Sequence, residues 1–171
     1  MADTSEIRSI FVTGLKNAHA MENQALSIMK PQVSRIETYP DVAARLEQHI
    51  QETEGQIARL EEALGSLDED HSTLKDMALS AAGSLAAMGH SAAGDEILKN
   101  SFANFAFENY EIAAYKSLVT IAEQGGFPGV VPALKANLDE EIAMARWLDD
   151  HLKGVTMKFA SLKEAGMSAK V

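Results

Sequence analysis

The sequence predicts an all-α protein, a four-helix bundle built from two helical hairpins joined by a long crossover that contains an extra helix. Apolar residues recur at helical intervals along most of the 171-residue chain, and no stretch shows the alternation typical of a strand. Pro and Gly interrupt this pattern at two positions that suit hairpin turns. Spacings of 30, 59 and 30 residues, which two hairpins would produce, separate four glutamates: Glu22, Glu52, Glu111 and Glu141.

Length and composition indicate one domain, residues 1–171, because 46% hydrophobic residues in 18.4 kDa suffice for a single core. A formal net charge of −10 disfavours nucleic acid and anionic lipid as partners. The chain has no cysteine, so any metal would need oxygen and imidazole ligands. No apolar run approaches the roughly 18 residues of a membrane span, and the N-terminus lacks the basic start of a signal peptide. We therefore expect a cytoplasmic protein.

The first hairpin consists of two long amphipathic helices. We expect the first helix to start at Thr4 or Ser5, to kink at Pro31 and to end near Thr38. The chain then turns at 39–40, where the proline suits the first turn of the second helix. The inward residues of the two helices are Ile7, Phe11, Leu15, Ala18, Ala25 and Met29, then Val42, Leu46, Ile50, Ile57, Leu60 and Leu64.

The second hairpin follows a crossover, residues 66–94, whose Ala-rich part from Leu74 to Met88 predicts a helix of its own. We expect the third long helix to start near Asp95, the chain to turn at 125–128, and the fourth helix to start at Gly129. Residues 154–171 predict a short final helix and a frayed polar tail. The inward residues are Leu98, Phe105, Ile112, Tyr115, Val119 and Ala122, then Val131, Leu134, Leu138, Ile142, Ala145 and Leu148.

Carboxylates interrupt the apolar faces of these helices, notably Glu22, Glu108, Glu111 and Glu141. A carboxylate buried in a bundle costs several kcal/mol unless it is protonated, paired or bound to a cation. A protonated or arginine-paired side chain would explain any one of them. Several at matching heights repel one another unless a cation holds them, so the set predicts a metal site. Two divalent ions bridged by glutamates would offset the repulsion among these carboxylates, and hard oxygen donors suit iron(II) or manganese(II).

The sequence does not decide which residue of the second helix would bind the metal. Glu52 projects from the flank of the apolar stripe, whereas His49 lies nearer its centre, so either or both could reach a metal. An ordinary core histidine is an equal alternative for His49. Gln56 could be a weak oxygen donor or could orient a ligand. Tyr115 could donate a hydrogen bond to Glu111 or take part in electron transfer, although a buried tyrosine with any acceptor is the plainer interpretation.

Other features support no competing chemistry. The sequence has no glycine-rich phosphate loop after a strand and no Gly-x-Ser-x-Gly motif, so no motif supports another enzyme class. The remaining histidines are expected at the surface: His19, His71, His90 and His151.

Four segments in this order and spacing resemble the YciE/YciF family of bacterial stress proteins: Asn17–Ala25, Glu47–Thr53, Phe107–Tyr115 and residues 139–148. The resemblance spans nearly the whole chain. It implies a ferritin-like bundle that forms a homodimer. It also implies a ferroxidase-like site with two iron ions, and dioxygen or peroxide as the oxidant.

Ferritin-like di-iron proteins generally carry Glu on the first helix, Glu-x2-His on the second, Glu on the third and Glu-x2-His on the fourth. The glutamates of this pattern match Glu22, Glu52, Glu111 and Glu141. The histidines do not, because Gly55 and Met144 stand at their positions. His49 and Glu108, each three residues before a matching glutamate, are candidate substitutes. An oxygen-rich site of this kind shifts preference from iron towards manganese or magnesium.

Two functions are therefore predicted. The first is a stress-related oxidoreductase with two iron ions, or manganese instead, that is ferroxidase-like or peroxide-consuming. Its metal ligands would be Glu22, Glu52, Glu111, Glu141, His49 and Glu108. The second is a non-catalytic structural or interaction protein of the stress response whose metal site is degenerate.

Overall fold

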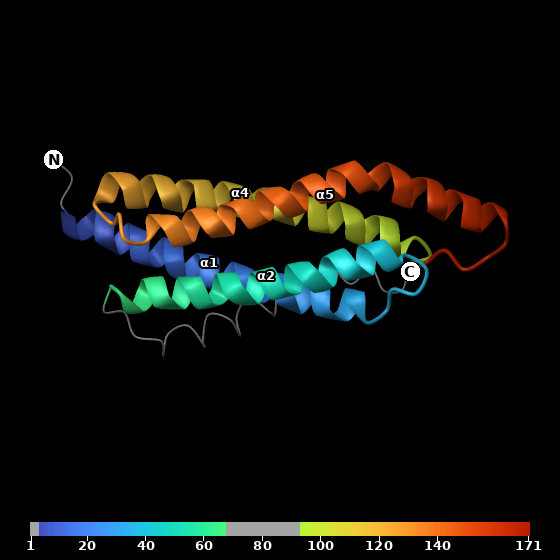
Figure 1. The fold of residues 1–171 in the computed structure, drawn as a ribbon, viewed down its shortest axis with the longest axis horizontal. Helices are drawn as coiled ribbons and strands as arrows, with labels where there is room; N and C mark the ends of the chain where they lie inside the picture. Colours follow the sequence, from blue (N-terminus) through green and yellow to red (C-terminus); the bar gives the residue numbers. More distant parts are fainter. Residues whose placement is uncertain (1–3, 68–92) are drawn as a thin grey trace.

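The computed structural model describes residues 4–67 and 93–171, and within these ranges the only regular secondary structure is α-helix. Its helices are α1 (Thr4–Val33), α2 (Pro40–Gly65), α4 (Glu96–Gly125) and α5 (Val131–Glu164). They form an elongated ferritin-like bundle in which α1 pairs with α2 and α4 pairs with α5 (Figure 1). This confirms the predicted fold class. The helix predicted within the crossover, from Leu74 to Met88, lies outside the described residues.

The helix boundaries follow the turn residues. α2 begins at Pro40 and α4 begins at Glu96, each at or next to its predicted start. α1 ends at Val33, earlier than the predicted Thr38. Its helical pattern fails just after Pro31, where the amides of residues 35 and 36 bond three residues back instead of four. Such a tightened 3₁₀ turn is frequent at the ends of α-helices.

The turn between α4 and α5 depends on a glycine with a left-handed backbone. Gly126 has a φ of 84°, which glycine adopts without the steric cost that other residues meet. The Phe127 amide then bonds the Ala122 carbonyl oxygen at 2.9 Å, which closes the end of α4. The Phe127 ring stacks on Phe11 of α1 with centroids 4.6 Å apart. The turn is thereby packed against the first hairpin.

The C-terminal part of the chain differs from the prediction of a short separate helix after Gly154. α5 runs without a break from Val131 to Glu164, and its C-terminal end projects beyond the other helices (Figure 1). One glycine inside a helix costs only about 1 kcal/mol relative to alanine, so Gly154 alone does not end it. Val155 and Phe159, which follow, pack against the core at this end of the bundle.

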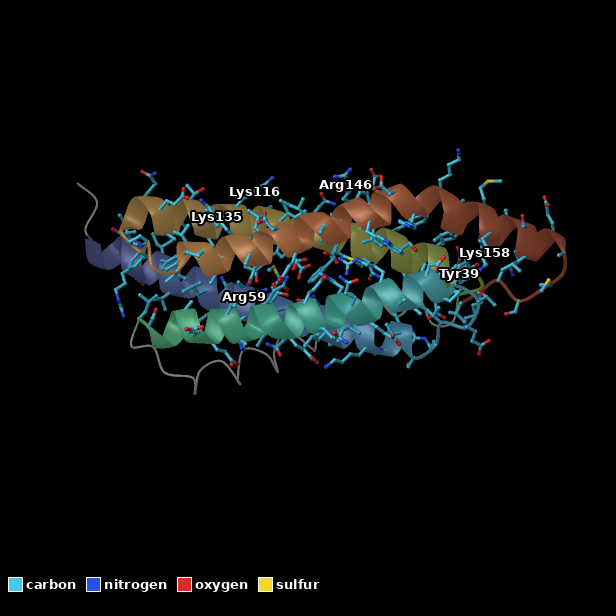
Figure 2. All side chains as sticks on the ribbon, in the orientation of Figure 1. Tyr39, Arg59, Lys116, Lys135, Arg146 and Lys158 are labelled. Carbon is cyan, nitrogen blue, oxygen red and sulfur yellow. The ribbon has the colours of Figure 1, made fainter. Side chains whose placement is uncertain are left out.

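The last residues are also anchored, although a frayed tail was predicted. Ala169 is 1% exposed, and its carbonyl oxygen accepts a hydrogen bond from the Tyr39 hydroxyl at 2.8 Å. Lys158 lies 5.2 Å from the centre of the Tyr39 ring at the same end of the molecule (Figure 2). The Ile97 amide donates to the Lys170 carbonyl oxygen at 2.9 Å. The tail thus satisfies one of the free amides at the start of α4, which explains why it is ordered.

A buried carboxylate connects three segments of the chain at this end of the bundle. Glu96 is fully buried and accepts hydrogen bonds from Arg35, 2.8 Å away at Nε, while Lys170 Nζ lies 3.3 Å from its other oxygen. Burial alone would raise the pKa of Glu96, but these two cations more than offset it and hold the pKa below its ordinary value. The contact joins the end of α1, the start of α4 and the tail.

The core consists of two apolar clusters with a polar layer between them. One cluster contains Phe11, Leu15, Met21, Leu60, Tyr115 and Leu134 among others. The other contains Ala25, Leu46, Ile97, Met144 and Leu148 among others. On every helix, the residues between these two sets include buried polar side chains. Ile142, predicted to be inward, is 41% exposed, because its neighbour Glu141 takes the inner face and successive helical residues turn by about 100°.

No helix among residues 4–67 and 93–171 combines the length and apolarity needed to cross a membrane.

Replacing Glu96 with glutamine should lower the free energy of unfolding at pH 7 by about 1–3 kcal/mol, the scale of hydrogen bonds to charged groups. Because the folded-state pKa is depressed, the stabilisation is present above the unfolded value near 4.5 and is lost as pH falls through the folded pKa. Urea unfolding at pH 7 and at pH 3 should therefore show a difference between variant and wild type that shrinks in acid.

The control for this prediction is Glu123→Gln, which breaks an exposed pair with Lys135 at 2.7 Å. Exposed pairs contribute about 0–1 kcal/mol, so this variant should stay close to wild type at both pH values. An equal effect of the two substitutions would contradict the role given to Glu96.

Candidate metal centre

All four described helices contribute a buried polar side chain at mid-length, between the two apolar clusters. Glu22 comes from α1, His49 from α2, Glu108 and Glu111 from α4, and Glu141 from α5. Each is at most 3% exposed. The helices carry these residues at intervals of three or four from their apolar neighbours, which keeps them on the inner face. The structure thus brings together five of the six predicted ligands.

His49 occupies the centre of the group. Its Nε2 lies 3.3 Å from Glu108 Oε2 and 3.5 Å from Glu141 Oε2. One donor atom from each of these three residues lies within 4.8 Å of the others, a spacing that suits a single metal ion. The three side chains come from three different helices, so only the packed bundle assembles them.

Glu52, the sixth predicted ligand, lies behind His49 instead of among the other glutamates. Its side chain is 21% exposed and accepts hydrogen bonds from His49 Nδ1 at 2.8 Å and from Arg45 at 3.0 Å. Gln48 donates a third at 2.8 Å. Burial would raise the pKa of Glu52, but the hydrogen bonds from His49 and Arg45 lower it to about 2. Glu52 is therefore a fixed negative charge that orients the imidazole.

His49 is the positive charge of this layer. Burial alone would lower the pKa of His49, but its hydrogen bonds to Glu108, Glu141 and Glu52 raise it to about 12. With carboxylates facing both ring nitrogens, the protonated ring can donate on each side. The metal-free protein thereby neutralises part of its own acidic cluster.

The remaining carboxylates are poorly satisfied. Glu22 Oε2 and both oxygens of Glu111 are buried without a hydrogen-bond partner among the described residues. Burial, reinforced by the charge of Glu141, raises the pKa of Glu22 well above its ordinary value. Burial, together with the charges of Glu22 and Glu141, does the same for Glu111. Burial also raises the pKa of Glu108 to about 8, even though His49 opposes the shift.

Glu141 behaves differently because donors surround it. Burial would raise its pKa, but hydrogen bonds from His49, from Glu108 and from Gln56 bring the pKa below its ordinary value. Gln56 Nε2 donates to Glu141 Oε1, which agrees with the orienting role considered for this glutamine. Of the gathered carboxylates, Glu141 is the one held most firmly in its charged form.

Hydrogen bonds connect Glu22 with the surface. The Tyr115 hydroxyl donates to Glu22 Oε1 and accepts from Asn137 Nδ2 at 2.9 Å. The acceptor of Tyr115 is thus Glu22 and not Glu111. Asn137 in turn accepts from Arg59, which projects from α2 and is 30% exposed (Figure 2). The sequence analysis missed Asn137, although its place four residues before Glu141 on the same helix face was a usable signal.

Two other histidines can be placed. His19 was expected at the surface but is 6% exposed, because it packs between α1 and α2 with Nε2 at 3.2 Å from Glu61 Oε1. His151 is exposed and stacks on Trp147, as expected of a surface histidine. His71 and His90 lie outside the described residues.

The donor set fits a hard divalent cation. It offers one imidazole nitrogen and several carboxylate oxygens. Five of these oxygens are buried without a hydrogen bond in the described structure, and two of the five, Glu108 Oε2 and Glu141 Oε2, face His49 Nε2 at 3.3 and 3.5 Å. Iron(II) and manganese(II) accept such mixed nitrogen and oxygen ligands. A cation among them would also remove the repulsion that raises the pKa values of Glu22 and Glu111.

Comparison with known proteins supports the resemblance found in the sequence. Residues 6–161 match the family described as "Domain of unknown function (DUF892)". The chain belongs to this family. Protein YciF of Escherichia coli K12 is 28% identical over 148 residues, which cover 80% of this chain and 84% of YciF. The predicted membership of the YciF group of stress proteins is therefore confirmed.

Solved structures of other proteins share the fold. A protein of Xanthomonas campestris is 33% identical with a TM-score of 0.79, covering 93% of this chain and 99% of its own. The E. coli stress protein YciF is 26% identical with a TM-score of 0.70, covering 89% and 96%. A putative structural protein of Rhodopseudomonas palustris, 24% identical with a TM-score of 0.67, covers 87% and 96% and supports the fold alone.

The metal-free protein should lose stability as pH rises from about 5 to about 8.5. The raised pKa values of Glu22, Glu108 and Glu111 mean that the folded state holds protons that the unfolded state has released above pH 4.5. The stabilisation from His49 is complete below its unfolded pKa of 6.5 and declines as pH rises towards about 12. The glutamates and His49 therefore both make the free energy of unfolding fall as pH rises. Chelator-treated protein unfolded in urea at several pH values tests this.

The variant Glu111→Gln should flatten that pH dependence, because the amide removes a buried carboxyl that must otherwise stay protonated. Glu54→Gln, which alters an exposed pair with Lys30, is the matched control and should keep the wild-type slope. A wild-type stability that rises between pH 5 and 8.5 would contradict the charge assignment.

Proposed function

We propose that this protein binds two divalent transition-metal ions, iron in first place and manganese as the alternative, at the mid-length polar layer. We propose further that it uses them as a stress-related oxidoreductase, ferroxidase-like or peroxide-consuming. The observation that carries this proposal is the convergence of His49, Glu108 and Glu141 within 4.8 Å, next to the unpartnered oxygens of Glu22 and Glu111.

The first ion would bind between His49 Nε2, Glu108 and Glu141. This position has the nitrogen donor, and its three donor atoms already lie at a spacing that one ion can bridge. His49 must release its Nε2 proton to bind, while Nδ1–H remains donated to Glu52 at 2.8 Å. Such a carboxylate behind a ligating histidine fixes the orientation of the ring and raises its basicity. Glu52 would thus serve the site without touching the metal.

The second ion would bind between Glu22 and Glu111, with Glu141 shared between the two ions. Glu111 interacts electrostatically with both Glu22 and Glu141, so the three carboxylates are close neighbours. Only oxygen donors are available here, and Glu22 is fixed by the Tyr115 hydroxyl. We therefore expect weaker binding and later loading at this position.

The protein contributes a dry, shaped environment. The apolar clusters on either side of the polar layer exclude water, and Tyr115 and Gln56 hold Glu22 and Glu141 in place. A pair of bound redox metal ions would supply the electrons passed to a small oxidant. A role in stress is supported by the similarity to E. coli YciF, whose structure is described as that of a stress protein.

Metal analysis tests the binding proposal. Protein purified without chelator, or loaded anaerobically with iron(II), should hold about two transition-metal ions per chain, as dinuclear carboxylate sites do. Glu111→Gln should reduce this to about one, because it removes a ligand of the second position only. Protein that stays metal-free after anaerobic iron(II) loading would overturn the proposal.

The orienting role of Glu52 gives a separate prediction. Glu52→Gln should weaken binding of the first ion by about 10- to 100-fold without changing the number of ions bound at saturation, as loss of such an outer partner typically does. Titration with manganese(II), followed by electron paramagnetic resonance, measures both quantities. Glu54→Gln makes the same change of charge two residues away and should leave the affinity unchanged.

A structural or interaction role remains the second candidate, and one observation favours it. The His49 imidazolium and the protonation of Glu22 and Glu111 let the acidic layer persist without metal. Substituting Glu22 and Glu141 together with glutamine separates the two functions. Unchanged metal content with equal or greater stability supports the structural role, whereas loss of metal supports the oxidoreductase.

The homodimer and the cytoplasmic location stay predictions. A mass measurement in solution and fractionation of cells would test them.

A further inference from the structure

A narrow hollow between α1 and α4 lies beside the candidate metal centre. Its lining includes Glu108, the ligand that pairs with His49 at 3.3 Å. The rest of the wall is formed by Phe107, which directly precedes Glu108, and by residues of α1 and α4 within about two turns of Glu22 and Glu108. Ile28 on α1 and Ala103 on α4 are partly exposed, so the hollow extends from the protein surface towards the buried carboxylate.

The wall is almost entirely apolar. Ala25, Ile28, Met29, Ala103 and Phe107 line it with hydrocarbon, sulfur or aromatic atoms. Both alanines stand where a larger apolar residue would fill the gap between the helices. A charged or strongly hydrogen-bonding molecule that entered would lose its water without finding donors or acceptors in return.

Besides Glu108, the polar residue of the wall is Asn104, and its side chain is already hydrogen-bonded. Asn104 Nδ2 donates to Gln32 Oε1 at 2.9 Å, and Gln32 Nε2 donates to Asn104 Oδ1 at 3.2 Å. This buried pair of amides ties α1 to α4 beside the hollow. Because the two amides face each other, Asn104 adds little polarity to the passage.

The size of the hollow restricts what can use it. The space open to a water-sized sphere is about 10 Å³, close to the room that one such sphere needs. A small apolar molecule fits both the size and the chemistry. Hydrogen peroxide, which carries two hydroxyl groups, would leave them unpaired, and a hydrated metal ion is both charged and too large.

We propose that this hollow admits dioxygen to the centre, and that dioxygen rather than peroxide is the oxidant that arrives on this side. Only the use of dioxygen as an oxidant rests on the proposed function. Entry of dioxygen beside Glu108 is a property of the bundle itself. It can therefore be measured without any metal.

The test uses the metal-free full-length protein with isotopically labelled methionine methyl groups, under dioxygen pressure. Dissolved dioxygen is paramagnetic and speeds the relaxation of nuclei that it approaches. Met29 lines the hollow, and Met144 does not, yet both are buried, at 3% and 0% exposure. The enhancement at the Met29 methyl should exceed that at Met144 severalfold.

The variant Ala103→Leu should fill the hollow and bring the Met29 enhancement down to the level of Met144. Ala106→Leu, which adds the same side chain at an exposed position of α4, should leave the enhancement as in the wild type. In iron-loaded protein, Ala103→Leu should slow oxidation by dioxygen severalfold and leave iron(II) affinity and oxidation by peroxide unchanged.

Equal enhancement at Met29 and Met144 in the wild type would overturn the proposal, as would a persistent Met29 enhancement in Ala103→Leu. If peroxide oxidation slowed as much as dioxygen oxidation, the preference for dioxygen would be wrong. If the relaxation results hold while no iron binds, the hollow admits dioxygen but the proposed oxidoreductase function fails. The two failures are thus distinguishable.

Discussion

The repulsion among carboxylates in a dry interior is the constraint on which this structure depends. Three helices, α1, α4 and α5, bring Glu22, Glu108, Glu111 and Glu141 into one layer, where water cannot screen their charges. The layer is compatible with a folded bundle only if cations or protons offset the charge. His49 is the cation that the chain itself supplies, and burial raises the pKa values of Glu22, Glu108 and Glu111, which favours their protonated forms. A bound metal would take over both roles.

The same constraint explains how the surroundings are organised. Neutral donors, the Tyr115 hydroxyl and the Gln56 amide, each approach one carboxylate oxygen, so that Glu22 Oε2 has no donor and Glu141 Oε2 faces only the His49 imidazole. The full positive charges of Arg45 and Arg59 stay at the rim, where they remain partly hydrated and bind the outer partners of the site. Cations placed deeper would occupy the oxygens that a metal needs. The apolar clusters on each side keep water out and hold the helices at a fixed height.

Sequence reasoning predicted much of the site, because a glutamate inside an apolar stripe contradicts its surroundings and is easy to see. Glu22, Glu108, Glu111 and Glu141 were found in this way. Spacing and family pattern placed Glu52 with them, while the apolar stripe put His49 nearer the centre of the second helix and left either or both as ligands. The rotation of α2 puts His49 on the inner face and Glu52 beside Arg45. A rotation of this kind depends on how the whole helix packs. The buried amides of Asn137 and Asn104 were missed because asparagine does not stand out in a helical pattern as glutamate does.

The sequence by itself determined the class of fold, two helical hairpins, and the acidic character of the layer between the two halves of the core. These follow from periodicity, turn residues and residue type, which are local properties. Only the tertiary structure decided which atoms meet: that His49 faces Glu108 and Glu141, that α5 continues past Gly154, and that the tail returns to cover the start of α4. Contacts between residues distant in the chain depend on the rotation and height of each packed helix, and a shift of one residue, about 100° around a helix, changes them all.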